Sequence, residues 1–324
     1  MKKLQKAAIS IIILGLVVVL ALPMIMTKAG LHPEYEGKEF NFNNKKALII
    51  ATNHGVLNKP NETIGKPTGL FLSELSIPYF EFKDANIDVT IASIDGGLIP
   101  VEPTPWFIET KEDKIFNESS ELTSLLTNSL SIKDIDFTEF DIVFLSGGWG
   151  AAYDLGFSEI LAVKITNAYN SGSLIGAICH GVLGLINATD ENGNLLIRGR
   201  KMTGVTNKQL KELGIYFTPM HPEEELRKAG VIFKSETKFK DIFANLVTVD
   251  DEKRFITGQN QNAGHEISQK IMEDFRLFNE LIIFGIFVSL YFSKYNTILR
   301  ADLGPKFGNF AKMSIRSLKD DIEI

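Results

Sequence analysis

The stretch "SLIGAICHG", residues 173–181, joins an apolar run to a glycine-flanked turn that holds the only cysteine of the 324-residue chain. His180 follows Cys179 directly. In α/β folds, a strand that leads through a tight turn into a helix presents a reactive side chain at the carboxyl edge of a parallel sheet. We therefore predict a strand at 173–178, a helix after the turn, and an α/β fold.

Similar apolar runs occur on both sides of this stretch and alternate with helix-like segments. This alternation predicts a mainly parallel sheet covered by helices. Residues 96–137 show no clear period and contain prolines at 100, 103 and 105, so we predict a loop-rich insertion of the kind that shapes a pocket. The remaining predicted elements are strands at 46–51, 87–93, 141–146 and 201–205, helices at 68–84, 158–170 and 263–275, and a hairpin at 246–258 that turns at 250–253.

Composition limits the kinds of partner. The chain has 34 basic and 40 acidic residues, a net charge of −6, and no basic stripe with interleaved aromatic residues, so nucleic acid is not expected as a partner. A single cysteine rules out an internal disulfide framework and any paired-cysteine zinc or redox motif. No histidine spacing suggests a metal site, and we expect neither metal nor cofactor. A small, weakly charged ligand fits this balance best.

The N-terminus has the composition of a membrane helix. Ala7 to Thr27 contains no charged residue and follows Lys2, Lys3 and Lys6. Twenty or so apolar residues are enough to cross the roughly 30 Å hydrocarbon core of a bilayer. We predict residues 1–30 to be a transmembrane anchor, with the lysines in the cytoplasm and the rest of the chain on the extracytoplasmic side. The alternative is a signal peptide that is cleaved after Ala29.

A second apolar segment lies near the C-terminus. Residues 277–293 contain one acid, Glu280, and are followed by a basic tail at 294–324. A second crossing would return the basic tail to the cytoplasm, as the positive-inside rule favours. The segment is therefore a possible second transmembrane helix, and the protein is a single-pass or a two-pass membrane protein. The alternative is an apolar helix that packs on the domain.

The position of Cys179 suggests a nucleophile. Unpaired backbone N–H groups at the start of a helix stabilise a thiolate, so we predict that the pKa of Cys179 is lowered. The alternative for a lone cysteine is a buried, inert thiol. The position of Cys179 at the turn between strand and helix favours the reactive interpretation.

Two further motifs supply groups for a reaction. "SGGWG", residues 146–150, follows the predicted strand at 141–146, and the N–H groups of Gly147 and Gly148 could form an oxyanion hole. Glu74 lies among apolar neighbours on a predicted helix, where burial would raise its pKa and keep it protonated for proton exchange with a substrate. The alternatives are an ordinary glycine turn and an acid that faces solvent.

Together these motifs resemble the ThiJ/PfpI superfamily. The resemblance is to its branch of heat-shock chaperones and glutathione-independent glyoxalases, and covers roughly residues 45–275. It implies a flavodoxin-like sandwich, with a catalytic domain at 34–276. The motifs, in chain order, are "TGLFLSE" (68–74), "SGGWG" (146–150), "AICHG" (177–181), "GNLLIRGRKMTGVTN" (193–207) and "TGQNQNAGHE" (257–266).

The resemblance also implies a reaction. Cys179 would be the nucleophile, Glu74 the acid beside it and His180 the partner base. Such a site converts methylglyoxal, a small reactive aldehyde, to lactate without metal or glutathione, as a glyoxalase III or deglycase and formally a lyase. Relatives are commonly dimers, so a homodimer is possible. The oxyanion site and pocket would be lined by Gly147, Gly148 and Trp149.

The chain departs from the family pattern at two positions. Leu210 stands where relatives usually have the acid that orients the histidine, and Glu212 is the nearest candidate to replace it. Trp149 stands where relatives often have histidine, which would change the shape of the pocket. The third member of the catalytic triad and the physiological substrate therefore stay open.

Other functions are compatible with the same residues. Cys179 and His180 could hydrolyse an amide or peptide. "MHPEE", residues 220–224, resembles the His-Pro-Glu of class I glutamine amidotransferases, although proline followed by acids is also an ordinary helix start. A non-catalytic alternative is a holding chaperone or a redox sensor in which Cys179 is oxidised.

Overall fold

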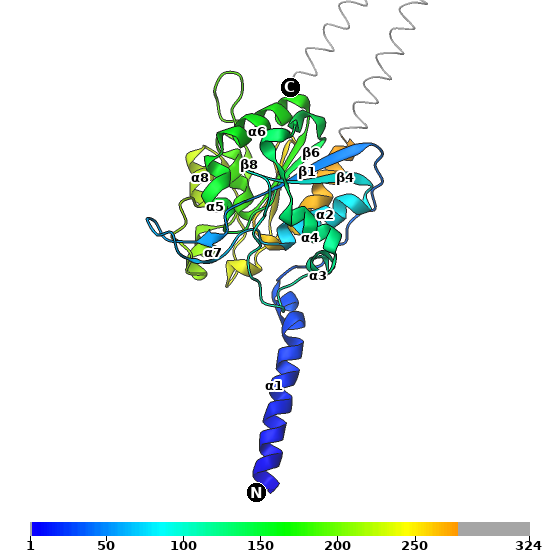
Figure 1. Cartoon of the computed structure of the whole chain (residues 1–324), viewed down its shortest axis with the longest axis vertical. Helices are drawn as coiled ribbons and strands as arrows, with labels where there is room; N and C mark the ends of the chain where they lie inside the picture. Colours follow the sequence, from blue (N-terminus) through cyan, green and yellow to red (C-terminus); the bar gives the residue numbers. More distant parts are fainter. Residues whose placement is uncertain (1, 278–324) are drawn as a thin grey trace, which may run out of the picture. The chain divides into compact units, whose positions relative to one another are not determined.

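The computed structural model describes residues 2–277. A seven-stranded sheet with the order β10-β11-β7-β6-β1-β4-β5 lies between helices on its two faces (Figure 1). All neighbouring strands are parallel except β10 and β11, so the predicted α/β class with a mainly parallel sheet is confirmed. The strands are β1 (Lys45–Ala51), β4 (Ile87–Ser93), β5 (Leu130–Ser131), β6 (Ile142–Leu145), β7 (Leu174–Ile178), β10 (Val247–Val249) and β11 (Phe255–Gly258).

The central strands are buried along almost their whole length, as expected of parallel strands covered on both sides. On one face, Leu161 and Ile165 of α6 join the core formed by alternate residues of β1, β6 and β7. On the other face, Phe82 of α2 packs edge-on against Phe144 of β6, with 6.2 Å between ring centroids. Besides α1 (Lys2–Ala29) and a closing helix at 264–277, the helices are α2 (Ser73–Asp84), α3 (Lys111–Glu118), α4 (Ser120–Thr127), α5 (Ala151–Asp154), α6 (Glu159–Ser171), α7 (Asn207–Glu212) and α8 (Pro222–Lys228).

Most predicted elements are present within one or two residues of their expected bounds. Helix α6 begins after Ser158, whose hydroxyl accepts the N–H of Leu161, and ends at Gly172 in the left-handed conformation. The closing helix is also present, at residues 264–277. The predicted strand at 201–205 is reduced to β8 (Lys201–Met202), which pairs with β9 (Ile232–Phe233) outside the main sheet.

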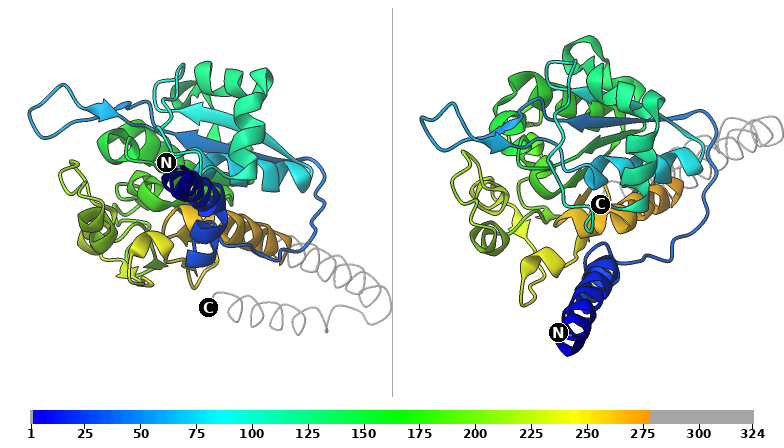
Figure 2. Two further views of the ribbon diagram at one scale, coloured as in Figure 1. Left: turned by 90° about the horizontal axis from the view of Figure 1, so that it is seen from below. Right: turned by 60° about the horizontal axis from the view of Figure 1, so that its bottom comes forward.

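Two predictions, one for helix α2 and one for the insertion that follows it, were wrong. Helix α2 begins at Ser73 and not at residue 68, because Leu70 donates its N–H to Pro100 and forms a bridge with Val101. The insertion at 96–137 is not mainly loop, since it contains α3 and α4. Helix α3 starts with a capping box between Thr110 and Asp113. This helix start was not predicted from the sequence because the three prolines before it indicated a loop. A small hairpin of β2 (Val56–Leu57) and β3 (Lys66–Pro67) also extends from the body (Figure 2).

Helix α1 (Lys2–Ala29) contains one candidate membrane span. Its window Ile12–Ala29 has a mean hydropathy of 2.3, and none of it is buried. Length and composition therefore allow a crossing, although a signal sequence would meet the same criterion. The predicted second span at 277–293 and the basic tail at 294–324 fall outside the described residues, apart from residue 277.

The predicted hairpin at 246–258 is formed by β10 and β11, and its turn is held by Asp250. One oxygen of this buried carboxylate accepts the N–H groups of Arg254 and Phe255 at 2.7 and 2.8 Å, and the other pairs with Arg200. Because β11 lies beside β7, this turn supports the strand that carries Cys179.

We expect Asp250→Ala to lower the free energy of unfolding by roughly 2 kcal/mol or more, since it removes the acceptor of the Arg254 and Phe255 N–H groups and one of the two carboxylates that pair with Arg200. The matched control is Asp251→Ala. Asp251 is an exposed neighbour that pairs with Lys201 at the surface, and its loss should cost at most about 1 kcal/mol. Thermal denaturation of both variants measures the difference, and equal losses would contradict the role given to Asp250.

Candidate active site

Cys179 lies in a strained turn at the end of β7. Its φ is +57°, in the left-handed region that costs a non-glycine residue roughly 1 to 3 kcal/mol. The chain continues as the 3-10 helix η4 (Cys179–Leu185), not as the predicted α-helix. The turn is packed against the end of β6, because a Cβ at Gly181 would lie 2.2 Å from the carbonyl oxygen of Leu145. Strand, turn and glycine together hold the thiol in one position.

Glu74 lies beside this thiol, in the first turn of α2. Its side chain is buried, and its pKa is raised to about 8, mainly by removal from water and further by the charge of Glu102. Hydrogen bonding to the Cys179 thiol and to the N–H groups of Gly147 and Gly148 acts in the opposite direction. The group is therefore a neutral carboxylic acid at pH 7, as the sequence led us to expect. Its Oε2 is buried without a partner of regular hydrogen-bond geometry.

The predicted lowering of the Cys179 pKa was wrong. Burial raises this pKa above its ordinary value, and the Glu74 carboxylate raises it further. The N–H groups of His180 and Gly148 do lower the pKa, as expected for donors at this turn, but they do not compensate for the loss of solvent. With 7% of its surface exposed, the resting cysteine is a protonated thiol.

Two glycines shape the opposite wall of the site. A Cβ at Gly147 would lie 2.5 Å from Oε2 of Glu74 and 2.8 Å from the backbone nitrogen of His180. A Cβ at Gly148, whose φ is +96°, would lie 2.3 Å from the carbonyl oxygen of Gly69. Only glycine fits these positions, and the close approach places backbone N–H groups beside the thiol and the acid.

His180 is buried next to the cysteine. Its Nδ1 lies 3.4 Å from the sulfur, and its ring packs against Trp149 with 4.9 Å between centroids. Burial lowers the pKa of His180 to about 3, and the charge of His221 contributes in the same direction. The imidazole is therefore neutral, and its Nε2 is buried without a hydrogen-bond partner.

No carboxylate takes the place of the missing family acid. Leu210 is fully buried in α7. Glu212 accepts the N–H of Asp241 at 2.8 Å and lies 3.8 Å from Lys208, so the structure directs it away from His180. Within residues 2–277, the Nε2 of His180 therefore has no acid to orient it.

Sequence reasoning missed the nearness of His221 to this site. The residue caps α8, with Pro222 at the first helical position and three acids in the first turn, so the "MHPEE" motif is the ordinary helix start. Its charge nevertheless affects His180, and its own Nε2 is also buried without a partner. No local signal in the sequence connects the two histidines.

Glu102 is a second carboxyl group that the sequence did not single out. Its N–H donates to the carbonyl of Leu70 at 2.8 Å, which fixes it beside the segment that leads into α2. Burial raises its pKa to about 7, opposed by the main-chain and indole N–H groups of Trp149. Its Oε2 is buried and unpartnered. The only sequence signal was its place in an insertion predicted to border a pocket.

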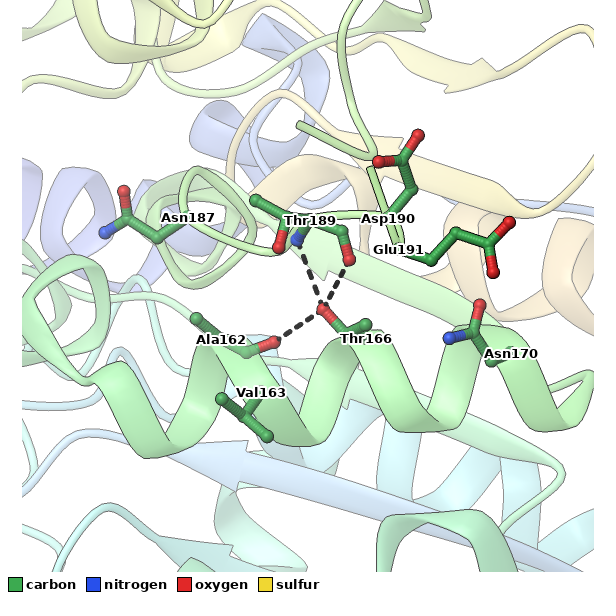
Figure 3. A pocket seen from close by; sticks show the side chains of 8 residues that line it. All are labelled: Ala162, Val163, Thr166, Asn170, Asn187, Thr189, Asp190 and Glu191. Carbon is green, nitrogen blue, oxygen red and sulfur yellow. Dashed lines mark hydrogen bonds between the residues drawn. The ribbon is translucent and has the colours of Figure 1, made fainter. Parts of the chain in front are cut away.

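A surface pocket of about 190 Å³ lies elsewhere, between α6 and the segment after η4 (Figure 3). Several of its polar groups are bound within the protein. Thr166 Oγ1 donates to the carbonyls of Ala162 and Thr189 and accepts the N–H of Thr189, and Asn187 donates to the carbonyl of Gly156. None of the predicted site residues lines it, and we assign it no role. The lining residues are Ala162, Val163, Thr166, Asn170, Asn187, Thr189, Asp190 and Glu191.

The described residues contain no group of three His, Cys, Asp or Glu side chains placed to hold a metal ion. The site therefore consists of a thiol, two buried carboxyl groups and a neutral imidazole at the carboxyl ends of parallel strands. Such a set can carry out covalent and acid–base chemistry with the protein's own side chains.

Fold and site together define a cysteine-centred α/β class. The chain belongs to the DJ-1/PfpI family, whose model matches residues 68–274. A curated relative, Glyoxalase 3 of Candida albicans, is 32% identical over 177 residues, which cover 52% of this chain and 72% of the relative. The glutathione-independent glyoxalase hsp3102 of Schizosaccharomyces pombe is 27% identical over 195 residues, 58% of this chain and 76% of that protein.

A solved structure is similar over the same region. The Rapid Encystment Protein 24 KDa of Francisella tularensis is 32% identical, with a TM-score of 0.65 over 71% of this chain and 99% of the other. The predicted superfamily is therefore confirmed, and so is its branch, whose relatives are named glutathione-independent glyoxalases.

The raised pKa of Cys179 predicts slow alkylation by iodoacetamide at pH 7 and a rise in rate only in the alkaline range. Glu74→Gln should move this rise to lower pH, because it removes a negative charge that raises the pKa of the thiol. The control is Glu139→Gln, which changes an exposed carboxylate. Rates measured against pH give the result. Fast alkylation of the unsubstituted protein at neutral pH would show that the thiol is ionised after all.

Proposed function

We propose that this protein is a cysteine-dependent glyoxalase that converts methylglyoxal to lactate without glutathione. The observation that carries the proposal is the burial of the Cys179 thiol and the protonated Glu74 carboxyl group in one site beside Gly147, where each affects the pKa of the other. The names of the family relatives agree with this chemistry. The site residues also supply each proton transfer that the reaction needs.

The first step is addition of the thiol to the aldehyde. The sulfur of Cys179 bonds to the aldehyde carbon, and the thiol proton passes to Nδ1 of His180, 3.4 Å away. Glu74 gives its proton to the aldehyde oxygen, so that no free alkoxide forms. The product is a hemithioacetal, and the new charge on His180 is balanced by the Glu74 carboxylate.

The second step is an internal oxidation and reduction of the bound substrate. The Glu74 carboxylate removes the hydrogen from the former aldehyde carbon, and His180 protonates the ketone oxygen, which gives an enediol. Glu74 returns its proton to the neighbouring carbon and takes up the proton of the hydroxyl on the former aldehyde carbon, which gives a lactoyl thioester. Water then cleaves the thioester with His180 as base, releasing lactate and restoring the thiol. Overall, methylglyoxal gains one water, and no external electron donor or acceptor is required.

We propose further that α1 anchors the catalytic domain on the extracytoplasmic face of a membrane. The support is the apolar window Ile12–Ala29, none of which is buried against the protein, together with the three lysines that precede it. An exposed stretch of this length is costly in water and stable in hydrocarbon.

Cys179→Ala should abolish lactate formation from methylglyoxal, because no other thiol exists in the chain. Glu74→Gln should lower kcat about 10²- to 10⁴-fold, the usual contribution of a general acid–base group. Glu139→Gln should leave the rate unchanged, since that carboxylate is exposed. Lactate is measured with the full chain in detergent. Absence of lactate with the unsubstituted protein would reject the proposal, and activity that survives Cys179→Ala would reject the role of the thiol.

The charge of Glu102 should affect the pH dependence of kcat/KM. The reaction needs protonated Glu74, so the alkaline limb of kcat/KM should report its pKa of about 8. The charge of Glu102 raises that pKa, and Glu102→Gln should therefore lower it and move the alkaline limb to lower pH. The matched control, Glu109→Gln, changes a carboxyl of the same insertion and should leave the profile in place. If the alkaline limb of kcat/KM stays at the same pH in Glu102→Gln, Glu102 does not affect the pKa of Glu74.

A further inference from the structure

We propose that the catalytic domain rests on the bilayer through the surface that surrounds the end of α1. This membrane-facing surface consists of Tyr35, Trp106, Lys238, Phe239 and Lys240. The inference depends on the proposed anchoring by α1 and goes beyond it, because an anchor alone would allow the domain to stand away from the membrane.

The first step is that almost no free chain separates the candidate span from the domain. Helix α1 ends at Ala29, and Gly30 and Leu31 cap it with N–H bonds to the carbonyls of Thr27 and Met26 at 2.9 and 3.0 Å. Leu31 is already buried, with 2% of its surface exposed. One residue, Gly30, therefore lies between the helix and the first side chain of the packed domain.

The second step is that this attachment is held on both sides. The N–H of His32 donates to Oδ1 of Asn262 at 2.8 Å, and Nδ2 of Asn262 donates to the carbonyls of Ile242 and Ala244. A Cβ at Gly30 would lie 2.9 Å from the carbonyl oxygen of Phe243. The end of α1 is therefore tied to residues 242–244, and a span that ends at Ala29 brings this part of the domain to the headgroups.

The third step is that exposed aromatic side chains gather around this attachment. Phe239 is 92% exposed and follows Lys238, whose Nζ lies 3.3 Å from the position of a Cβ on Gly30. Trp106 is 50% exposed and lies two residues before Ile108, whose main chain lies near enough to the His32 ring to raise its pKa. Tyr35, 38% exposed, is three residues beyond His32.

The described residues have only one other exposed aromatic side chain, Phe157, which precedes α6. An almost fully exposed phenylalanine is unfavourable in water, and tryptophan, tyrosine and phenylalanine are favoured where hydrocarbon meets headgroups. The gathering of three of the four exposed aromatic residues at the attachment of α1 indicates that a bilayer, rather than solvent, covers them.

The charges around the attachment fit the same partner. Lys28, Lys238 and Lys240 are exposed, and their ammonium groups can reach the phosphate groups of lipid headgroups. The acid that follows Lys240, Asp241, is buried and bonded to Thr206 and Lys208. Exposed acids of the same segments offset part of this attraction, so apolar contact carries the larger share. These acids are Glu34, Glu36, Glu39 and Glu236.

The test uses the fluorescence of the chain's two tryptophans. The full-length protein is reconstituted in vesicles of phosphatidylcholine and phosphatidylglycerol, with and without lipids brominated near the headgroup, which quench indoles at that depth. Trp149 is 8% exposed and lies in the active site. We expect the bromolipids to remove most of the Trp106 emission, and Trp106→Phe to abolish the quenched component. Phe239→Ser should weaken the quenching, and the matched control Phe157→Ser should not.

Two failures are distinguishable in the same samples by extraction with alkaline carbonate. Protein that is released by carbonate has no inserted helix, which overturns the anchoring and this inference with it. Protein that resists extraction, but is quenched no more than Trp106→Phe, is anchored with its domain away from the bilayer. That outcome overturns the membrane-facing surface alone and leaves the proposed enzymatic activity untouched.

Discussion

The burial of the Cys179 thiol against the Glu74 carboxyl group is the constraint on which the site depends. Two groups that become anions cannot both ionise where water is excluded, so burial keeps protons on the pair and raises both pKa values. The strained turn at Cys179 and the glycines at 147 and 148 have a common effect, since each allows backbone to approach without placing a side chain between thiol and acid.

This arrangement links the reactivity of the thiol to the presence of a carbonyl. In the resting protein the sulfur is protonated and largely covered, which protects it from alkylation and oxidation. In the proposed reaction an aldehyde accepts the proton of Glu74, and the negative charge moves to the carboxylate as the sulfur gives up its own proton. The penalty for ionising the thiol in isolation is then avoided. The acid thus supplies selectivity as well as protons, because a partner without a carbonyl oxygen cannot take part in the exchange.

The sequence predicted the parts of the fold that depend on local pattern. β1, β6 and β7 were predictable because parallel strands buried on both faces are continuous apolar runs, and Glu74 because a lone acid among apolar residues is conspicuous. The start of α2 was not, because it depends on pairing with a segment thirty residues away. The positions of Glu102 and His221 near the site were not predictable either, because long-range packing brings both residues there. The prediction of a lowered pKa for Cys179 was wrong because the sequence shows only the N–H donors of the local turn. Burial, which raises the pKa, is a property of the whole fold.

The loss of the family acid at Leu210 changes how His180 is prepared for its role. Its Nδ1 faces the thiol proton, so the neutral ring carries its own proton on Nε2, where no partner accepts it. An unpaired buried donor costs about 1 to 3 kcal/mol, and here the cysteine itself selects the tautomer instead of a carboxylate. An acid on the far side would also stabilise the imidazolium. Without one, the pKa stays near 3, and a charged His180 can exist only together with a new negative charge on the sulfur or on Glu74. In the proposed mechanism, His180 therefore acts as a base only while substrate is being converted.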